Sequence, residues 1–306
     1  MGERRAPLGL MGPPAGPVLV VLAAGRARRY GGLKPLAPVG PAGEAVLDLL
    51  ASDATKAGFA SLVLVVSPSS APALRYHVEK RWPPTLDVRF AVQGTPLGTV
   101  DAVLAAGEHL AAGSAFGVSN GDDLYGSGPL ALVAEHLAGP GAGAEDALVG
   151  FHLANAVIGD APVTRGVCAV DPSGWLQAID ERREVRPVGD GRFEARDGRQ
   201  PVKLDGEVLV SMNLWSFSDG TRRLLEEAMR RATGASVDAE VLLPEVMGRL
   251  TAAHDGRPPA ATCRVLPTEG RCIGVTHPED LALVQADLAR QVASGERPAE
   301  LWSHLR

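Results

Sequence analysis

The sequence is poor in cysteine. Among 306 residues it has three, Cys168, Cys263 and Cys272, which show neither the C-x-x-C spacing typical of zinc sites nor a paired framework. Neither zinc ligation nor structural disulfides are therefore indicated. A chain of this kind fits a reduced compartment, and we expect a cytoplasmic localisation.

The sequence also lacks a basic excess and a long apolar run. Its 30 Lys and Arg stand against 36 Asp and Glu, which gives a net charge of −6. No overall positive field is then available to hold nucleic acid or an anionic membrane through counterion release. No stretch approaches the ~20 apolar residues of a membrane span. We expect neither a nucleic-acid nor a membrane partner.

The N-terminal segment, residues 1–16, is expected to be a flexible tail. An arginine pair precedes apolar residues there, as in an export signal, but Pro13, Pro14 and Pro17 interrupt the apolar region. The seven histidines are scattered and form no HxxxH or HExxH pair. The opening segment and the histidines therefore give no positive signal for export or for a zinc enzyme.

Apolar strands and helix-like segments alternate along the first half of the chain. Four strand-then-helix units in about 120 residues are typical of a doubly wound, mainly parallel α/β sheet with helices on both faces. The expected strands are 18–24, 61–67, 88–93 and 115–119, and the expected helices are 44–57, 71–81, 99–111 and 129–138.

The second half has a mixed pattern. The segment VRPVGDGRFEARDG, residues 185–198, alternates in polarity and carries Asp-Gly pairs, which predicts an exposed hairpin. We therefore expect one Rossmann-like domain over residues 17–306, with halves of residues 17–138 and 139–306. Further strands are expected at 147–152, 166–170, 175–180, 207–217 and 262–266, and helices at 221–232, 241–250 and 278–293.

The stretch VLVVLAAGRARRYGGLKPLAPVG, residues 18–40, runs from an apolar strand into a loop rich in glycine and cations. Open α/β sheets bind ligands beyond the carboxyl ends of their strands, and glycine lets backbone N–H groups approach a polyphosphate. The patterns GxxxxGK[ST] and GxGxxG both fail, because Pro35 follows the lysine and Ala27 replaces the second glycine. The competing interpretation is a plain strand-to-helix connection with solvated arginines.

Two segments of this stretch resemble the signature of the sugar-1-phosphate nucleotidylyltransferases, L-A-A-G-x-G-x-R followed by K-x-L-x-P-V. They are LAAGRARR at residues 22–29 and KPLAPVG at residues 34–40. Ala27 departs from the signature, since the family usually has its second glycine there. A methyl group at this position would narrow the fit of the loop to a triphosphate.

More distant motifs follow in the order that this family has them. Three late landmarks, at 163–168, 274–280 and 298–302, are similar to one little-characterised branch, so the resemblance spans residues 18–303. It implies a Rossmann-like α/β fold with a smaller sugar-binding subdomain in the second half. The other matching motifs are QGTPLGT at 93–99, NGDDLYG at 120–126, IDER at 179–182 and VSMNLWSF at 210–217.

The resemblance implies a role for each matching residue. Arg29 and Lys34 would be catalytic, because they stabilise charge on the phosphates. Asp122 and Asn213 would bind Mg²⁺, with Asp123 as a second-choice ligand. The residues implied in nucleotide binding are Leu22, Ala23, Ala24, Gly25, Gln93, Gly98 and Thr99, and those implied in sugar-phosphate binding are Glu181 and Arg182.

Residue chemistry alone leaves a structural alternative at each position. Asp122 could cap an Asx turn, Asn213 could be a satisfied core asparagine, and Thr99 could be a helix N-cap. Glu181 and Arg182 could belong to a solvated charge run. In addition, arginine at 182 stands where the family has lysine, which replaces a point charge with a planar fork.

The resemblance implies an enzyme that joins a nucleoside triphosphate to a sugar 1-phosphate or a sugar-like cyclitol phosphate. Pyrophosphate would leave in a Mg²⁺-dependent reaction, giving a nucleotide-activated sugar. Family members often form dimers or tetramers, so a homo-oligomer is among the expectations. Two alternatives stay open: a cytidylyltransferase acting on a non-sugar phosphate such as phosphocholine, and a non-catalytic nucleotide-binding homologue, which Ala27 would favour.

Overall fold

The computed structural model describes residues 16–25, 33–141, 143–236, 239–253, 258–274 and 280–305. The predicted tail, apart from Gly16, lies outside these residues. Ala27 and Arg29 of the glycine-rich loop also lie outside the described residues.

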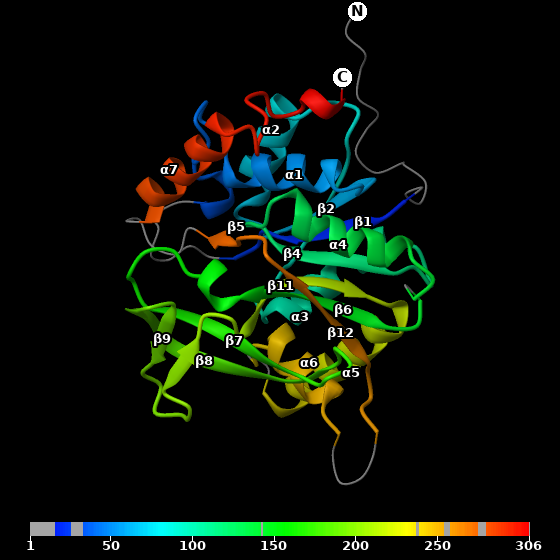
Figure 1. The fold of residues 1–306 in the computed structure, drawn as a ribbon. Helices are drawn as coiled ribbons and strands as arrows, with labels where there is room; N and C mark the ends of the chain where they lie inside the picture. The colour runs from blue at the N-terminus through cyan, green and yellow to red at the C-terminus, as the bar shows by residue number, and fades with distance from the viewer. Residues whose placement is uncertain are drawn as a thin grey trace, which may run out of the picture.

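In the described part of the chain, seven strands form the central sheet, in the order β3-β2-β1-β4-β11-β6-β12. Six of these run in one direction and β11 runs opposite to them, so the predicted mainly parallel sheet is confirmed (Figure 1). The strands are β1 (Val18–Leu22), β2 (Ser61–Val66), β3 (Asp87–Val92), β4 (Phe116–Asn120), β6 (Asp146–His152), β11 (Leu209–Phe217) and β12 (Cys263–Thr268).

Helices cover both faces of this sheet, as the continuous apolar strands predicted. On β1, Leu19 and Val21 face one core cluster, whereas Val18 and Val20 face the other. Figure 1 shows the two helical layers above and below the sheet. The upper layer holds α1 (Val46–Lys56), α2 (Ala71–Arg81), α4 (Ser127–Ala138) and α7 (Asp280–Ala293), and the lower layer holds α3 (Thr99–Ala105), α5 (Asp219–Ala235) and α6 (Leu243–Thr251).

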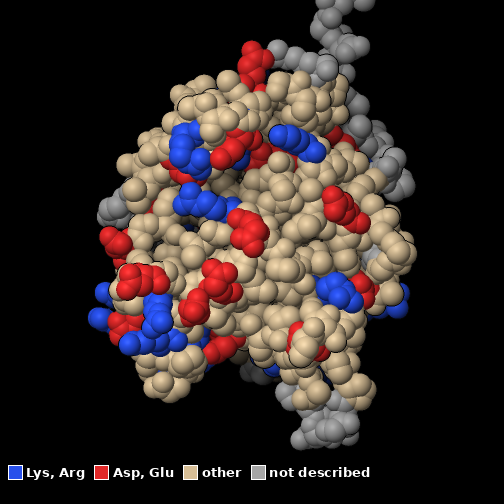
Figure 2. Space-filling model, viewed as in Figure 1, with Lys and Arg blue, Asp and Glu red and all other residues tan. Residues whose placement is uncertain are grey.

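An antiparallel meander extends the sheet beyond β11. It comprises β7 (Val163–Val170), β8 (Leu176–Gly189), β9 (Arg192–Ala195) and β10 (Lys203–Asp205). The predicted hairpin at 185–198 is confirmed, and positive φ angles at Asp190 and Gly191 close its turn. Acidic and basic side chains lie next to one another over this end of the molecule (Figure 2).

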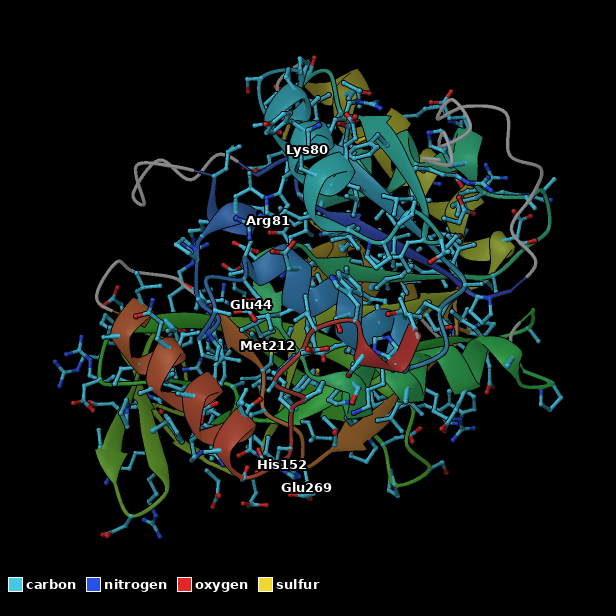
Figure 3. The ribbon with its side chains drawn as sticks, turned by 90° about the horizontal axis from the view of Figure 1, so that it is seen from above. Glu44, Lys80, Arg81, His152, Met212 and Glu269 are labelled. Carbon is cyan, nitrogen blue, oxygen red and sulfur yellow. The ribbon has the colours of Figure 1, made fainter. Side chains whose placement is uncertain are left out.

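A bulge in β11 lies where the meander meets the central sheet. Ser211 pairs with Gly150 and Trp215 with Leu148, so the three residues 212–214 stand opposite a single residue of β6. On its other edge, β11 pairs first with β7 and then, beyond the bulge, with β4. Met212, at the start of the bulge, lies near the middle of the molecule (Figure 3). The strand therefore changes its neighbour at the bulge.

Short elements complete the fold. They are β5 (Asp123–Leu124), β13 (Ile273–Gly274) and the 3-10 turns η1 (Lys34–Leu36), η2 (Gly107–His109), η3 (Leu153–Asn155) and η4 (Ser303–Leu305). Within the described ranges, no helix has the length and apolar character needed to cross a bilayer.

Candidate functional site

The carboxyl ends of β1 and β4 lie side by side and carry the first part of the site. Leu22 pairs with Asn120, and the Gly121 N–H donates to the Leu22 carbonyl oxygen at 2.9 Å. A Cβ on Gly121 would lie 2.9 Å from that oxygen, so only glycine lets the turn pass this close to β1. The turn places Asp122 beside the start of the glycine-rich loop.

A cavity of about 630 Å³, here called the strand-end cavity, opens over these strand ends. It brings together most of the residues predicted for nucleotide and metal binding. Ala23 is the exception among the described loop residues, since it is buried in the core beneath. The predicted residues that line the cavity are Leu22, Ala24, Gly25, Gln93, Gly98, Thr99, Asp122 and Asn213, and the other lining residues are Pro96, Ala102, Asn120 and Glu240.

Lys34 forms an ion pair with Asp122 beside this cavity. The Lys34 Nζ lies 3.7 Å from Asp122 Oδ2, and both side chains are partly exposed. Burial raises the pKa of Asp122, and the charge of Lys34 counteracts part of that effect. The predicted catalytic cation and the predicted metal ligand are thus adjacent, although the two lie far apart in the sequence.

The hydroxyl group of Tyr125 ties the Asp122 turn to the bulge of β11. It accepts a hydrogen bond from the Asn120 N–H at 3.0 Å and donates one to the Met212 carbonyl oxygen at 2.8 Å. Tyr125 is 1% exposed, and burial raises the pKa of its phenol well above the ordinary value, so it stays protonated. The two strands that carry the predicted metal ligands are therefore bonded to each other through one side chain.

Asn213 sits at the centre of the bulge in a left-handed conformation, with φ 56°. Asparagine tolerates this conformation better than most residues. The Trp215 Nε1–H donates to Asn213 Oδ1 at 3.2 Å, which orients the amide oxygen. A carbonyl oxygen can accept a second interaction, so Asn213 Oδ1 keeps one lone pair for a ligand.

These donors suit a magnesium ion that is bound together with a nucleotide. Mg²⁺ prefers oxygen ligands and is commonly held by one or two carboxylates, with substrate phosphates and water in the other positions. Asp122 offers a carboxylate and Asn213 an amide oxygen to the same cavity. Across the described segments, no cluster of three His, Cys, Asp or Glu side chains is placed to hold a metal. The residues thus fit a shared Mg²⁺ site rather than a closed metal cage.

The segment from Gln93 to Thr99 is shaped by its own hydrogen bonds. Gln93 Nε2 donates to the Gly98 carbonyl oxygen at 3.0 Å and to Asp101 Oδ2 at 2.8 Å. Thr99 Oγ1 accepts from the Leu243 N–H at 2.8 Å, so it anchors α6 rather than capping its own helix. Because the amide N–H groups of Gln93 are used in this way, its oxygen is the atom that remains for a ligand donor.

A second cavity, of about 200 Å³, lies between the central sheet and the meander, and we call it the inter-sheet cavity. It shares Asn120 and Asn213 with the strand-end cavity, so the two adjoin at the bulge. The predicted residue Glu181 lines it. The remaining lining residues are Asp123, Thr164, Arg165, Gly166, Ile179, Ser211, Met212, Leu242, Pro244 and Glu245.

Arg182 is placed differently from the expectation. Successive side chains of a strand point to opposite faces, and Arg182 lies on the face of β8 away from the cavity that Glu181 lines. Its guanidinium donates to both carboxylate oxygens of Asp197, at 2.8 and 3.1 Å, and to two carbonyl oxygens. The side chain is 1% exposed. The structure therefore gives Arg182 a structural ion pair and does not bring it to the site.

The inter-sheet cavity also contains three charged residues that the sequence did not place among its main site residues. They are Asp123, which was predicted only as a second-choice metal ligand, Arg165 and Glu245. Asp123 is nearly buried, accepts a hydrogen bond from Asn120 Nδ2 at 2.8 Å, and has its pKa raised to about 6 by burial and by the charge of Asp122. Arg165 and Glu245 were missed. Arg165 belongs to a family-like landmark, but no spacing rule shows which residue of that landmark faces a cavity.

The sequence also contains a G-x-S-x-G pattern, residues 117–121, of the kind that places a nucleophilic serine on a sharp turn. Here Ser119 lies within β4 and is 0% exposed. A nucleophile has to reach its substrate, so this serine is part of the core.

The comparisons with known proteins agree with this architecture. Residues 19–163 match the model of a family described as the MobA-like NTP transferase domain. The crystal structure of HddC from Yersinia pseudotuberculosis is similar over 88% of this chain and 98% of that one, with a TM-score of 0.56 and 16% identity. The same protein complexed with GMP-PN gives the same coverage and TM-score at 18% identity. No match is found among curated proteins.

At this identity, the likeness to HddC shows a shared fold. The predicted Rossmann-like α/β architecture, with a mostly parallel central sheet, is thereby confirmed. The matched stretch includes β1, the glycine-rich loop, the Gln93 segment and the Asp122 turn. Over residues 19–163, the chain thus carries a domain that matches the MobA-like NTP transferases.

Proposed function

We propose that this protein joins a nucleoside triphosphate to a sugar 1-phosphate or a cyclitol phosphate, releasing pyrophosphate and forming a nucleotide-activated sugar. The observation that carries the proposal is the meeting of two cavities at Asn120 and Asn213. One opens over the strand ends of the matched transferase domain, and the other is lined mostly by the second half of the chain. A donor and an acceptor can therefore meet at the bulge.

The residues that line each cavity indicate which substrate it would bind. We assign the donor triphosphate to residues 17–138 and the acceptor to residues 139–306. Lys34, together with Arg29 outside the described residues, would bind the triphosphate and stabilise charge on the leaving pyrophosphate. Gln93 and Gly98 would frame the nucleoside.

The chemistry needs no covalent intermediate with the protein. An oxygen of the acceptor phosphate attacks the α-phosphorus of the nucleotide, and the bond from that phosphorus to the β-phosphate oxygen breaks. The acceptor is already ionised at neutral pH, so no side chain has to remove a proton. Asp122 and Asn213 would hold Mg²⁺, which supplies charge neutralisation across the phosphates when bound. We place the reaction in the cytoplasm, and a homo-oligomer remains an expectation from the family.

A pyrophosphate-release screen tests the proposal. Purified protein with Mg²⁺ is given ATP, CTP, GTP, UTP or dTTP in combination with sugar 1-phosphates, cyclitol phosphates and phosphocholine. Release that requires one nucleotide and one sugar or cyclitol phosphate supports the proposal and names both substrates. Release with phosphocholine alone would assign the cytidylyltransferase alternative. Nucleotide binding without any release would assign the non-catalytic alternative.

A pair of lysine variants shows whether the release comes from this site. Lys34→Ala should lower turnover by at least ~100-fold, which is typical of losing a preorganised charge in a transition state. Lys80→Ala is the matched control, because Lys80 is exposed on α2, near the top of Figure 3, and lines neither cavity. Equal activity in the two variants would contradict the role of Lys34.

A further inference from the structure

Arg165 reaches the inter-sheet cavity from β7 without an acidic partner. Among the described residues, no carboxylate oxygen lies within 4.0 Å of its guanidinium, whereas Arg182, in the next strand, has Asp197. Arg75 is another partly buried arginine that has no ion pair with a described residue, and it lies over the ring of Phe90, 4.4 Å from the centroid. Within the described ranges, Arg165 has no such ring contact. Its charge is therefore balanced only at longer range, by carboxylates such as Asp123, and not by a direct ion pair among the described residues.

Backbone carbonyl groups hold this guanidinium in place. Nε and Nη2 both donate to the Ala156 oxygen, at 2.9 and 2.6 Å, and Nη1 donates to the Thr164 oxygen at 2.8 Å. These carbonyls are neutral, so they fix the orientation of the group without cancelling its charge. The described residues accept from three of the five N–H bonds of Arg165, which leaves two for a ligand. An arginine that is fixed in this way needs little further ordering on binding an anion.

The charges around Arg165 support a ligand that has both an anionic and a hydroxyl-rich part. Arg165 is the one cation among the described residues that line the inter-sheet cavity, and Asp123, Glu181 and Glu245 are its acids. Burial lowers the pKa of Arg165 and the charge of Asp123 opposes that effect, yet an arginine remains ionised at neutral pH. The carboxylates can accept hydrogen bonds from hydroxyl groups but would repel phosphate oxygens.

We propose that Arg165 binds the phosphate group of the acceptor, in the role that the sequence had suggested for Arg182. The inference rests on the proposed function, and it narrows the acceptor to a phosphomonoester whose body carries hydroxyl groups for Glu181 and Glu245. The planar guanidinium fork can donate two parallel hydrogen bonds to phosphate oxygens. The cavity adjoins the strand-end cavity at Asn213, so a phosphate held there faces the donor site.

The kinetic test uses Arg165→Gln and Arg165→Lys with the substrate pair that the screen identifies. Arg165→Gln should raise KM for the acceptor by roughly 10- to 100-fold, since it removes a charged hydrogen-bond donor, while KM for the nucleotide changes less than about twofold. Arg165→Lys should fall between Arg165→Gln and the wild type, because it keeps the charge but loses the fork. Arg223→Gln is the control, since Arg223 is exposed on α5 and lines neither cavity.

Two outcomes would overturn the inference while leaving the proposed function intact. One is an unchanged KM for the acceptor in folded Arg165→Gln, and the other is an equal rise in KM for both substrates, which would indicate a general structural role. Thermal melting of each variant separates loss of folding from loss of binding.

A labelling experiment covers the case in which the screen finds no turnover. Wild-type protein is treated with phenylglyoxal, with and without inorganic phosphate or α-glucose 1-phosphate, and the modified arginines are identified by peptide mass spectrometry. Phosphate should slow modification of Arg165 but not of Arg223. Failure of the screen with protection of Arg165 would reject the proposed reaction and keep an anion site. Equal labelling of Arg165 with and without both anions would reject the anion site itself.

Discussion

Replacing Tyr125 with phenylalanine removes a hydroxyl group that joins the Asp122 turn to the β11 bulge. The change deletes a single oxygen from a side chain that is 1% exposed, so the ring keeps its packing. Two backbone groups lose their partner: the N–H of Asn120 and the carbonyl oxygen of Met212. The substitution therefore tests one connection without creating a large void.

The expected loss of stability follows from those two groups. A buried polar group left without its hydrogen bond costs about 1–3 kcal/mol, so Tyr125→Phe should lower the free energy of unfolding by about 2–6 kcal/mol. Activity should fall as well, because Asp122 and Asn213 are no longer held at a fixed separation. A misplacement of about 1 Å at such a site can cost roughly 100-fold in rate. The Mg²⁺ concentration needed for half-maximal activity should rise.

Urea denaturation followed by far-UV circular dichroism measures the stability, and a Mg²⁺ titration of pyrophosphate release measures the second effect. Tyr76→Phe is the matched control, because Tyr76 is 64% exposed on α2 and should change neither quantity. If Tyr125→Phe unfolds within about 0.5 kcal/mol of the wild type, the size range of an ordinary surface substitution, the bridge does not connect the two strands as argued. A stable variant with an unaltered Mg²⁺ requirement would refute the positioning role.

Three further substitutions probe the surroundings of the site. Gly98→Ala should cost at least about 3 kcal/mol in urea denaturation, because Gly98 has φ +97° and an added Cβ would fall 2.3 Å from the Val241 carbonyl oxygen. Burial alone would raise the pKa of Asp48, but hydrogen bonds to the carboxylate hold this pKa below the usual 3.8. The ionised carboxylate therefore stabilises the fold above pH 3.8. This contribution disappears as the pH falls through the pKa of Asp48 in the folded state. The deficit of Asp48→Asn in unfolding free energy should therefore be larger at pH 7 than at pH 3. Arg182→Ala should lower the free energy of unfolding by about 3–5 kcal/mol, since it leaves the buried Asp197 carboxylate without its cation. Nucleotide binding, measured by titration at a temperature where the variant is folded, should be unchanged.

The sequence predicted well those strands whose burial can be inferred from their own residues. VLVVL is apolar at every position and SLVLVV at every position after Ser61, which is expected only where both faces of a strand are covered. The Asp-Gly pair of the β8–β9 hairpin determines its turn in the same local way. The long strand β8 was foreseen in two parts, as the strand 175–180 and as the first arm of the 185–198 hairpin. The charged residues 181–184 between them were not assigned to a strand, because the same composition is typical of a solvated loop.

The acceptor side was predicted less well, for a physical reason. The alternation of a strand shows that Glu181 and Arg182 point to opposite faces, but it does not show which face adjoins a cavity. That depends on β7, on α6 and on the connection that supplies Asp197, all distant in the sequence. Arg165 was missed for the same reason. Its defining property is the lack of a carboxylate partner among the described residues, and this follows only from the three-dimensional arrangement.

The bulge at Asn213 could not be read from the hydrophobic pattern either, because it inserts two extra residues rather than one. Two residues preserve the period of a strand, so Val210, Met212 and Leu214 still face one core cluster and Trp215 faces the other. The apolar alternation is therefore unbroken across the bulge. What marks the position is asparagine itself, which accepts a positive φ and offers an amide oxygen. Asn213 thus lies at the bulge where the neighbour of β11 changes from β7 to β4, and it also lies where the two cavities meet.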